Sequence, residues 1–457
     1  MQALHEAGQA AVGNNLEHSA SPMSTNSSDR LKNFIFKYSV FTFVLFCLRD
    51  GFTGSVRYYF QMLGISFVWF LPDVLAFGSV LIFSYFQIFK ERNPVGIFFV
   101  AAFCLALFTS VIFMNDSAFT LFSSIKMFIP MFVGFCFYER RITDIKWAQY
   151  LFLFVFFASA IGVILNPYVE YPWYGQVLVN FGVEREATKM WWVDGVPRYG
   201  GFAGDSTMAA FMTLFTYLLI SPYRGIIFNV LCWPIVIIAL YLTNSKTAIG
   251  IAGIYAILYT AMNFVPYASR VPLVKTFTLL SFICLIVPPI LMIALGGVDL
   301  GAIDPKLESM ADRINNTWNG PFIWISELFP VGMFTGCGIG CYSYPMSYTD
   351  MAKYNLPLDN FYMTTFLMMG YPFLLFVAFL FSRVPFMRDP IKLSILMLWN
   401  IYSVTVQGYG PSYATLLYGY AISEVFGRVS IRRSSTRSLK RAPEGNPGLQ
   451  TIAAQPG

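Results

Sequence analysis

Long apolar stretches alternate with short polar segments along the chain, after a polar N-terminal stretch. A helix that crosses a bilayer needs about 20 mostly apolar residues. Twelve stretches are candidates: residues 33–49, 65–89, 94–113, 118–138, 147–166, 206–220, 226–243, 247–264, 273–296, 360–381, 392–408 and 413–427. The pattern therefore predicts an all-α, polytopic integral membrane protein with about twelve transmembrane helices, of which the sixth, eleventh and twelfth are short.

The polar segments predict how the chain is organised around these helices. Residues 1–32 have no basic segment followed by an apolar core, so they predict a disordered cytoplasmic tail and not a signal peptide. Residues 428–457 predict a basic cytoplasmic tail. Residues 33–427 form the expected transmembrane domain, in which only residues 167–205 and 297–359 are long loops.

Lys and Arg residues predict the orientation in the membrane. If both termini are cytoplasmic, the inner segments before the C-terminal tail hold thirteen Lys and Arg residues and the outer segments hold nine. Cytoplasmic loops are enriched in Lys and Arg, so we expect both termini inside and both long loops outside. The internal repeats typical of transporters are not visible.

Composition supports a membrane protein and removes several reaction classes. Charged residues make up 12% of the chain, against about a quarter in soluble domains, and mean hydropathy is +0.59. His5 and His18 both lie in the polar N-terminal stretch, so the apolar body has no Ser-His-Asp triad and no His-ligated haem or zinc. The chain has no Gly-x-x-x-x-Gly-Lys-Ser/Thr phosphate loop, which excludes an ATPase of that type.

The first long loop enters the next apolar stretch through the motif Arg198-Tyr-Gly-Gly-Phe-Ala-Gly-Asp-Ser-Thr207. Glycines allow a ligand to approach the backbone closely, and a guanidinium binds phosphate through two hydrogen bonds. Alternatively, Asp205 and Ser206 cap the following helix, and Arg198 holds lipid headgroups. This segment alone favours neither interpretation.

A short outer turn, Thr243-Asn-Ser-Lys-Thr-Ala248, carries a second basic residue. Lys246 stands directly before an apolar helix, near the expected membrane surface. It can extend toward lipid phosphate, or it can point toward the same anion as Arg198. The first alternative is slightly favoured.

The second long loop contains three further motifs. Arg313-Ile-Asn-Asn-Thr-Trp318 precedes a glycine-rich stretch over residues 329–340, and Leu358-Asp-Asn-Phe-Tyr362 opens the next apolar stretch. Asp359 lies at the junction of loop and helix, where a carboxylate can also serve as a cap. Cys337 and Cys341 can pair outside the cytoplasm, but we expect two unpaired thiols.

An ionisable residue inside an apolar stretch needs a cavity or a partner. Asp73, Lys126 and Glu424 are such residues. Lys126 can form a structural pair with Asp73, or it can reach a lipid diphosphate. We expect the pair.

The order and loop positions of the motifs resemble the O-antigen ligase and polymerase family (the WaaL and Wzy types). The shared pattern is Arg-x-Gly-Gly-Phe entering a helix, a Thr-Asn-Ser-Lys-Thr turn, Arg-x-x-x-x-Trp, Pro-x-x-Gly-x-x-x-Gly-x-Gly, and Asn-x-Tyr opening a helix. It covers about residues 195–380. The aromatic- and Met-rich composition resembles the exopolysaccharide polymerases. Ligases of the family carry His before that Asn, whereas this chain has Asp359-Asn360.

The resemblance implies a GT-C-like architecture and a role for each motif. Arg198 and Arg313 would hold the diphosphate of a polyprenyl-linked donor, with Lys246 at the third basic position. The base candidates are Asp359 and Asp205, followed by Glu327, with no metal and no cofactor. Aromatic residues of the two long loops would bind sugars or belong to an interfacial belt: Trp173, Tyr174, Trp191, Trp192, Tyr199 and Trp318.

The resemblance thus implies a polymerase that joins polyprenyl-diphosphate-linked oligosaccharide repeat units at the periplasmic face of a bacterial inner membrane. Its partners would be the lipid-linked donor and acceptor, membrane lipid, a chain-length regulator and a flippase, but no nucleic acid. The alternatives are a ligase that transfers glycan to a lipid or protein, and a flippase or transporter of lipid-linked sugars. A structural subunit of a secretion complex is a weaker alternative.

Overall fold

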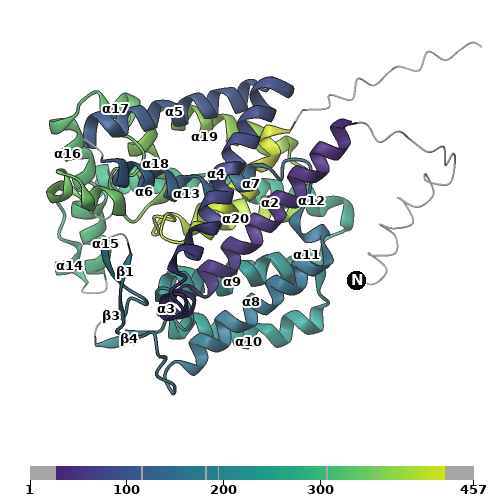
Figure 1. Cartoon of the computed structure of the whole chain (residues 1–457). Coiled ribbons are helices and arrows are strands. Elements are labelled where there is room, and N and C mark those ends of the chain that lie inside the picture. Colours follow the sequence, from purple (N-terminus) through teal and green to yellow (C-terminus); the bar gives the residue numbers. More distant parts are fainter. Residues whose placement is uncertain are drawn as a thin grey trace, which may run out of the picture. The chain divides into compact units, whose positions relative to one another are not determined.

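The computed structural model describes residues 27–114, 117–180, 183–193, 195–304, 307–356 and 358–427, and all structural statements concern these residues. Helices make up most of them, and two short antiparallel β-ribbons interrupt the helices (Figure 1). His5, His18, the C-terminal tail and most of the N-terminal tail lie outside the described residues.

The first part of the chain is helical and begins inside the predicted N-terminal tail. Its elements are α2 (Ser27–Gly51), α3 (Thr53–Met62), η1 (Ser66–Phe70), α4 (Leu71–Ser84), η2 (Tyr85–Lys90), α5 (Pro94–Met114), α6 (Ala118–Phe128), α7 (Pro130–Phe135), η3 (Ile142–Asp144) and α8 (Lys146–Leu165). The tail predicted to extend to residue 32 therefore ends earlier, because α2 starts at Ser27.

The first long loop folds into the two β-ribbons. β1 (Val177–Asn180) pairs with β2 (Val183–Glu186), and β3 (Trp191–Val193) pairs with β4 (Val196–Arg198). The tight β3–β4 connection contains Gly195 at φ +75°, a conformation that glycine adopts without steric cost. The all-α prediction is therefore correct for the body and misses these ribbons.

Helices again dominate the rest of the chain. The middle part holds α9 (Ser206–Ile220), η4 (Ser221–Tyr223), α10 (Ile226–Leu242), α11 (Lys246–Phe264), α12 (Tyr267–Ser281) and α13 (Ile283–Leu295). The second long loop contains short helices: α14 (Leu300–Ile303), α15 (Glu308–Asp312), η6 (Arg313–Thr317), α16 (Gly320–Leu328), α17 (Gly332–Thr335), η7 (Tyr344–Tyr348) and η8 (Ala352–Tyr354). The last elements are α18 (Phe361–Met369), α19 (Tyr371–Arg383), η9 (Val384–Phe386), α20 (Pro390–Tyr402), α21 (Ser412–Ile422) and η10 (Ser423–Phe426).

Among the described residues, seven helical segments are long and apolar enough to cross a membrane. They are Arg30–Gly51, Ser66–Lys90, Pro94–Met114, Ala118–Phe135, Lys146–Leu165, Lys246–Phe264 and Ala268–Leu295. Each coincides with one of the twelve predicted spans. Two further apolar helical segments, Ile226–Leu242 and Tyr371–Phe386, are shorter. These helices indicate a membrane-embedded protein, and the count of twelve stays a prediction.

The predicted span over residues 360–381 is broken into α18 and α19 at Gly370. Gly370 has φ +64°, and a Cβ atom there would lie 2.2 Å from the Phe334 carbonyl oxygen. A residue with a side chain would therefore clash with α17 and strain the backbone. Pro372 at the start of α19 is compatible with a new helix beginning at this position.

Short helices form the centre of the bundle. All residues of α21 after its first are buried, and α9 and α20 are also almost fully buried. α21 packs directly on α7, where a Cβ on Gly134 or Gly419 would lie 2.2 to 2.3 Å from the other helix's backbone. Such small residues allow helices to approach closely in a membrane.

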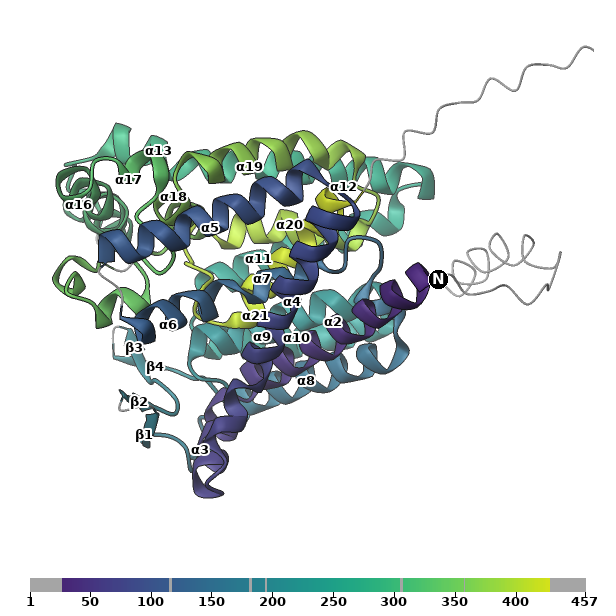
Figure 2. The ribbon, with the colours of Figure 1, turned by 45° about the horizontal axis from the view of Figure 1, so that its top comes forward.

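The two long loops lie at the same end of the bundle. Figures 1 and 2 both place the β-strands and α16 at the left, whereas the N-terminal end of α2 lies at the opposite end. The motifs of both loops are therefore on one side of the helical body.

Cys337 and Cys341 form a disulfide with Cα atoms 6.0 Å apart, so the prediction of two free thiols is wrong. Gly338 and Gly340 between them have φ of +100° and +95°. These conformations turn the chain back on itself, and a Cβ on Gly338 would lie 2.2 Å from the Ser110 backbone. The disulfide is buried against α5.

Candidate functional site

Arg198 joins the first loop to the short turn that carries Lys246. Its side chain lies on β4 and is half-buried, and its Nε donates a hydrogen bond to the Thr243 carbonyl oxygen at 3.0 Å. The backbone N–H of Tyr199 also donates to the Leu242 carbonyl at 3.2 Å. Burial lowers the pKa of the Arg198 guanidinium, which Asp205 nearby offsets in part. The structure thus brings the first two basic motifs together.

Asp205 caps helix α9, which is one of the two roles that the sequence left open. Its Oδ1 accepts a hydrogen bond from the backbone N–H of Met208 at 2.7 Å. Burial raises the pKa of the Asp205 carboxyl, and backbone hydrogen bonds and the Arg198 guanidinium oppose this effect. Its carboxylate is already engaged, which makes it a weaker candidate for a base.

Lys246 is the first residue of α11, and its side chain is exposed. Among the described residues, it makes no hydrogen bond or ion pair. Its neighbour Thr247 shares a 2.7 Å hydrogen bond with Thr405. The ammonium group is therefore available to an anion at the loop end of the bundle.

Arg313 and Asp359 come from distant parts of the second loop and interact electrostatically. Burial raises the pKa of Asp359, the Arg313 guanidinium lowers it, and Asp312 raises it. Arg313 donates through Nη1 to Ser309 Oγ at 3.3 Å, but its buried Nε has no hydrogen-bond partner among the described residues. An unsatisfied buried donor is costly, and an anionic ligand would satisfy it.

A connector between α20 and α21, residues 403–411, links these two regions, and the sequence analysis missed it. Thr405 contacts Thr247 in the short turn. The Val404 carbonyl accepts from Asn360 Nδ2 at 3.1 Å, next to Asp359. The predicted span over residues 392–408 includes most of this connector, although Gly408, Gly410 and Pro411 signal a helix end. α20 in fact ends at Tyr402.

The predicted sugar-binding aromatic residues divide into two groups. Trp191 and Trp192 are 42% and 61% exposed, and Tyr199 is half-buried. Trp318 is fully buried, so its ring has no face open to a sugar and its predicted role does not fit the structure. Trp173 is also buried, stacked on Tyr171 with ring centroids 4.8 Å apart.

Two further candidates lie apart from these residues. Glu327 is exposed on α16. Glu424 accepts hydrogen bonds from the backbone N–H groups of Arg388 and Asp389 at 2.7 and 3.0 Å, so it stabilises the start of α20. Among the described residues, no group of three His, Cys, Asp or Glu side chains is placed to hold a metal ion.

Lys126 forms the expected ion pair with Asp73, at 3.3 Å. Arg49, the last residue of the predicted span 33–49, joins the pair, with Nη1 2.9 Å from Asp73 Oδ1 and Nε 3.0 Å from Asp50 Oδ1. Asp50 Oδ2 also accepts from the Tyr413 backbone N–H at 2.6 Å. This cluster ties α2, α4, α6 and α21 together.

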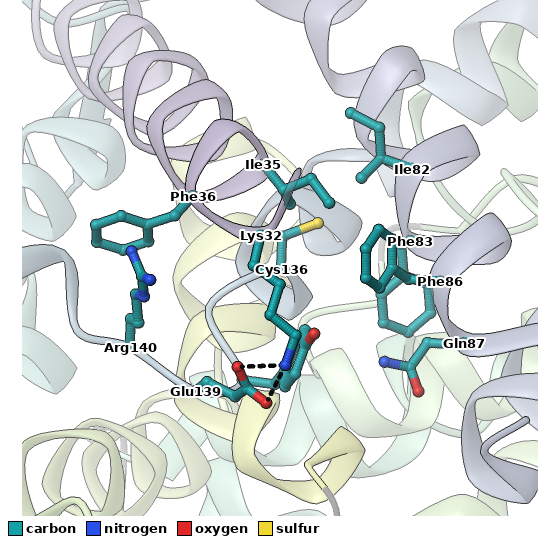
Figure 3. A pocket seen from close by; sticks show the side chains of 11 residues that line it. Lys32, Ile35, Phe36, Ile82, Phe83, Phe86, Gln87, Cys136, Glu139 and Arg140 are labelled. Carbon is teal, nitrogen blue, oxygen red and sulfur yellow. Dashed lines mark hydrogen bonds and ion pairs between the residues drawn. The ribbon is translucent and has the colours of Figure 1, made fainter. Parts of the chain in front are cut away.

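A small cavity lies toward the N-terminal end of α2. Figure 3 shows Lys32 paired with Glu139 at its edge, with 3.2 Å between Nζ and Oε1, and Gln87 nearby. The cavity has a volume of about 30 Å³, and the buried amide group of Gln87 has no partner among the described residues. This space suits an ordered water, not a sugar.

Comparison with models of known protein families, with characterised proteins and with solved structures finds no match. The resemblance to the O-antigen ligase and polymerase family therefore stays a prediction that rests on the motifs themselves.

Proposed function

We propose that the protein is a glycosyltransferase of the exopolysaccharide polymerase type. It joins polyprenyl-diphosphate-linked oligosaccharide repeat units at the periplasmic face of a bacterial inner membrane, with both termini in the cytoplasm. The observation that carries the proposal is the Arg313–Asp359 arrangement. It provides a cation with an unsatisfied buried donor beside a carboxylate, and this carboxylate makes no hydrogen bond among the described residues.

The reaction needs no nucleotide or metal, because the diphosphate already activates the sugar. An acceptor hydroxyl oxygen attacks the anomeric carbon of the donor, and a new glycosidic C–O bond forms. The bond between that carbon and the diphosphate oxygen breaks, and the polyprenyl diphosphate leaves with the electron pair. Asp359 accepts the proton of the hydroxyl, as a general base.

Basic side chains stabilise the negative charge that develops on the leaving diphosphate. Arg313 acts at the reacting phosphate, and one such preorganised donor contributes about 3 kcal/mol to transition-state binding. Arg198 on β4 and the exposed Lys246, in the turn that Arg198 contacts, provide further positive charge. Trp191 and Trp192 present open aromatic faces for the glycan.

Deleting the gene and analysing lipid-linked glycans tests the proposal against its alternatives. We expect single repeat units on the carrier and no long polymer. Long polymer that accumulates on the carrier would instead indicate a ligase. Repeat units confined to the inner leaflet would indicate a flippase. Normal chain length would contradict all three. Complementation with the wild-type gene is the positive control, and complementation with the Arg313→Ala gene is the matched negative control.

A further inference from the structure

A large apolar groove opens between α12–α13 and α18–α19. Its volume is about 1080 Å³, and its walls include Ile286, Pro289 and Ile293 on one side and Phe366, Leu374 and Ala378 on the other. Figure 2 shows α13, α18 and α19 close together along the upper edge of the bundle. Almost all of the lining side chains are apolar, so the groove excludes a sugar or a free phosphate.

The length of the groove is similar to the apolar thickness of a membrane. Its lining extends from Thr276 to Ile293, which corresponds to roughly 25 Å of helix at 1.5 Å per residue. The apolar core of a bilayer is about 30 Å thick. Pro288 and Pro289 lie inside α13, where they remove backbone hydrogen bonds and bend the helix. The groove is long enough for an extended hydrocarbon chain.

Three of the elements that line the groove connect to the Arg313–Asp359 site, either along the chain or through hydrogen bonds. Tyr362 and Met363 line the groove and lie in the first turn of α18, directly after Asp359 and Asn360. Phe322 lines it from α16, which follows the Arg313 turn.

The third element that connects the groove to the Arg313 turn is α13. Met292 and Ile293 line the groove near the end of that helix. Asn315, in the Arg313 turn, accepts a hydrogen bond from the Gly297 backbone N–H at 2.7 Å and donates to the Val298 carbonyl at 3.1 Å. These bonds hold the Arg313 turn directly over the end of α13.

We infer that this groove holds the polyprenyl chain of a lipid-linked substrate whose diphosphate lies at Arg313. The inference rests on the proposed function, because it takes the identity of the ligand from it. The Arg313 turn, which carries an unsatisfied donor and is bonded to the residues that follow α13, and the apolar groove itself match the two parts of a polyprenyl diphosphate. An ordinary phospholipid offers related chemistry, so the experiment must separate the two.

The first experiment fills the groove and varies the chain of the donor. Ala378 is exposed within the groove, so Ala378→Trp occupies space without disturbing buried packing. We expect kcat/KM to fall about tenfold for a donor with a full-length polyprenyl chain, the effect of losing contact with a few buried methylene groups. A donor shortened to a few isoprene units should be unaffected. Ala101→Trp, at an exposed position of α5 outside the groove, is the matched control.

The second experiment measures binding without turnover. A photoreactive polyprenyl diphosphate should label peptides of α13 and α19. Unlabelled polyprenyl diphosphate should compete, whereas phosphatidylglycerol should not. Equal competition by phosphatidylglycerol, or labelling only elsewhere, would overturn the inference, as would equal effects of Ala378→Trp on both donors. If the wild-type protein turns over no donor, the proposed function fails, and the labelling result still decides the groove.

Discussion

The region of Arg198 and Asp205 and the region of Arg313 and Asp359 differ in how many of their polar groups already make hydrogen bonds within the protein. Arg198 donates to the Thr243 carbonyl, and Asp205 accepts from the Met208 N–H as a helix cap. Arg313 retains a buried donor without a partner, and Asp359 makes no hydrogen bond among the described residues. A similar pair of residue types thus holds the fold together in one region and is free for chemistry in the other.

The largest effect should come from Asp359→Asn, which keeps the shape of the side chain but removes the base. We expect turnover to fall by about 10²–10⁴-fold, with unchanged expression and thermal stability. The measurement is glycosyl transfer by the purified protein in liposomes. Undiminished turnover would reduce Asp359 to a residue at a helix start.

The Arg313→Ala variant should follow, with a loss of about 10²–10³-fold from one missing transition-state donor. Arg198→Ala should lose less, about ten- to a hundredfold, because the Nε of Arg198 already donates to the Thr243 carbonyl, whereas the buried Nε of Arg313 has no partner among the described residues. Assaying both variants side by side compares the two regions directly. A larger loss for Arg198→Ala would reverse their assignment.

Asp205→Ala should act mainly on stability. Removing a helix cap costs about 1 kcal/mol, so we expect a lower unfolding temperature and nearly normal turnover at a temperature where the variant is folded. The control is Asp205→Asn, which retains a capping oxygen and should recover most of the stability. If the Asp205→Ala protein were fully folded but inactive, Asp205 and not Asp359 would be assigned as the general base.

The smallest effect is a shift in pH dependence. Asp359 must be deprotonated to act as a base, and because burial raises its pKa, activity should be lost on acidification at a pH above the ordinary value for Asp of about 3.9. Asp312 raises this pKa and is itself exposed. Asp312→Asn should therefore move the acidic limb of kcat/KM to lower pH, and an upward shift would contradict the assignment.

The apolar pattern was sufficient to predict the seven long helices, since their length and hydropathy are local properties of the sequence. The Asp73–Lys126 pair was also predictable, because a charge inside a membrane needs a partner. The participation of Arg49 in that cluster was not, since it depends on how α2 packs against α4. The break at Gly370 likewise depends on a contact with residue 334, distant in sequence.

The sequence motifs identified four candidate residues but not which of them are available to a substrate. These residues are Arg198, Lys246, Arg313 and Asp359. Their availability depends on which polar atoms find partners after folding, such as the Thr243 carbonyl for Arg198. Trp318 illustrates the same limit, because an aromatic residue in a loop motif can be fully buried. The connector around Thr405 was not predicted because its apolar residues continue the hydrophobic pattern of the preceding helix.

Reconstitution of the purified protein with a polyprenyl diphosphate oligosaccharide tests the central claim most directly. The account predicts a ladder of products, each longer by one repeat unit and still carried on polyprenyl diphosphate, with no added nucleotide. The Asp359→Asn protein in the same liposomes should produce no ladder. Unchanged single repeat units with the folded wild-type protein, or an equal ladder from both proteins, would contradict it.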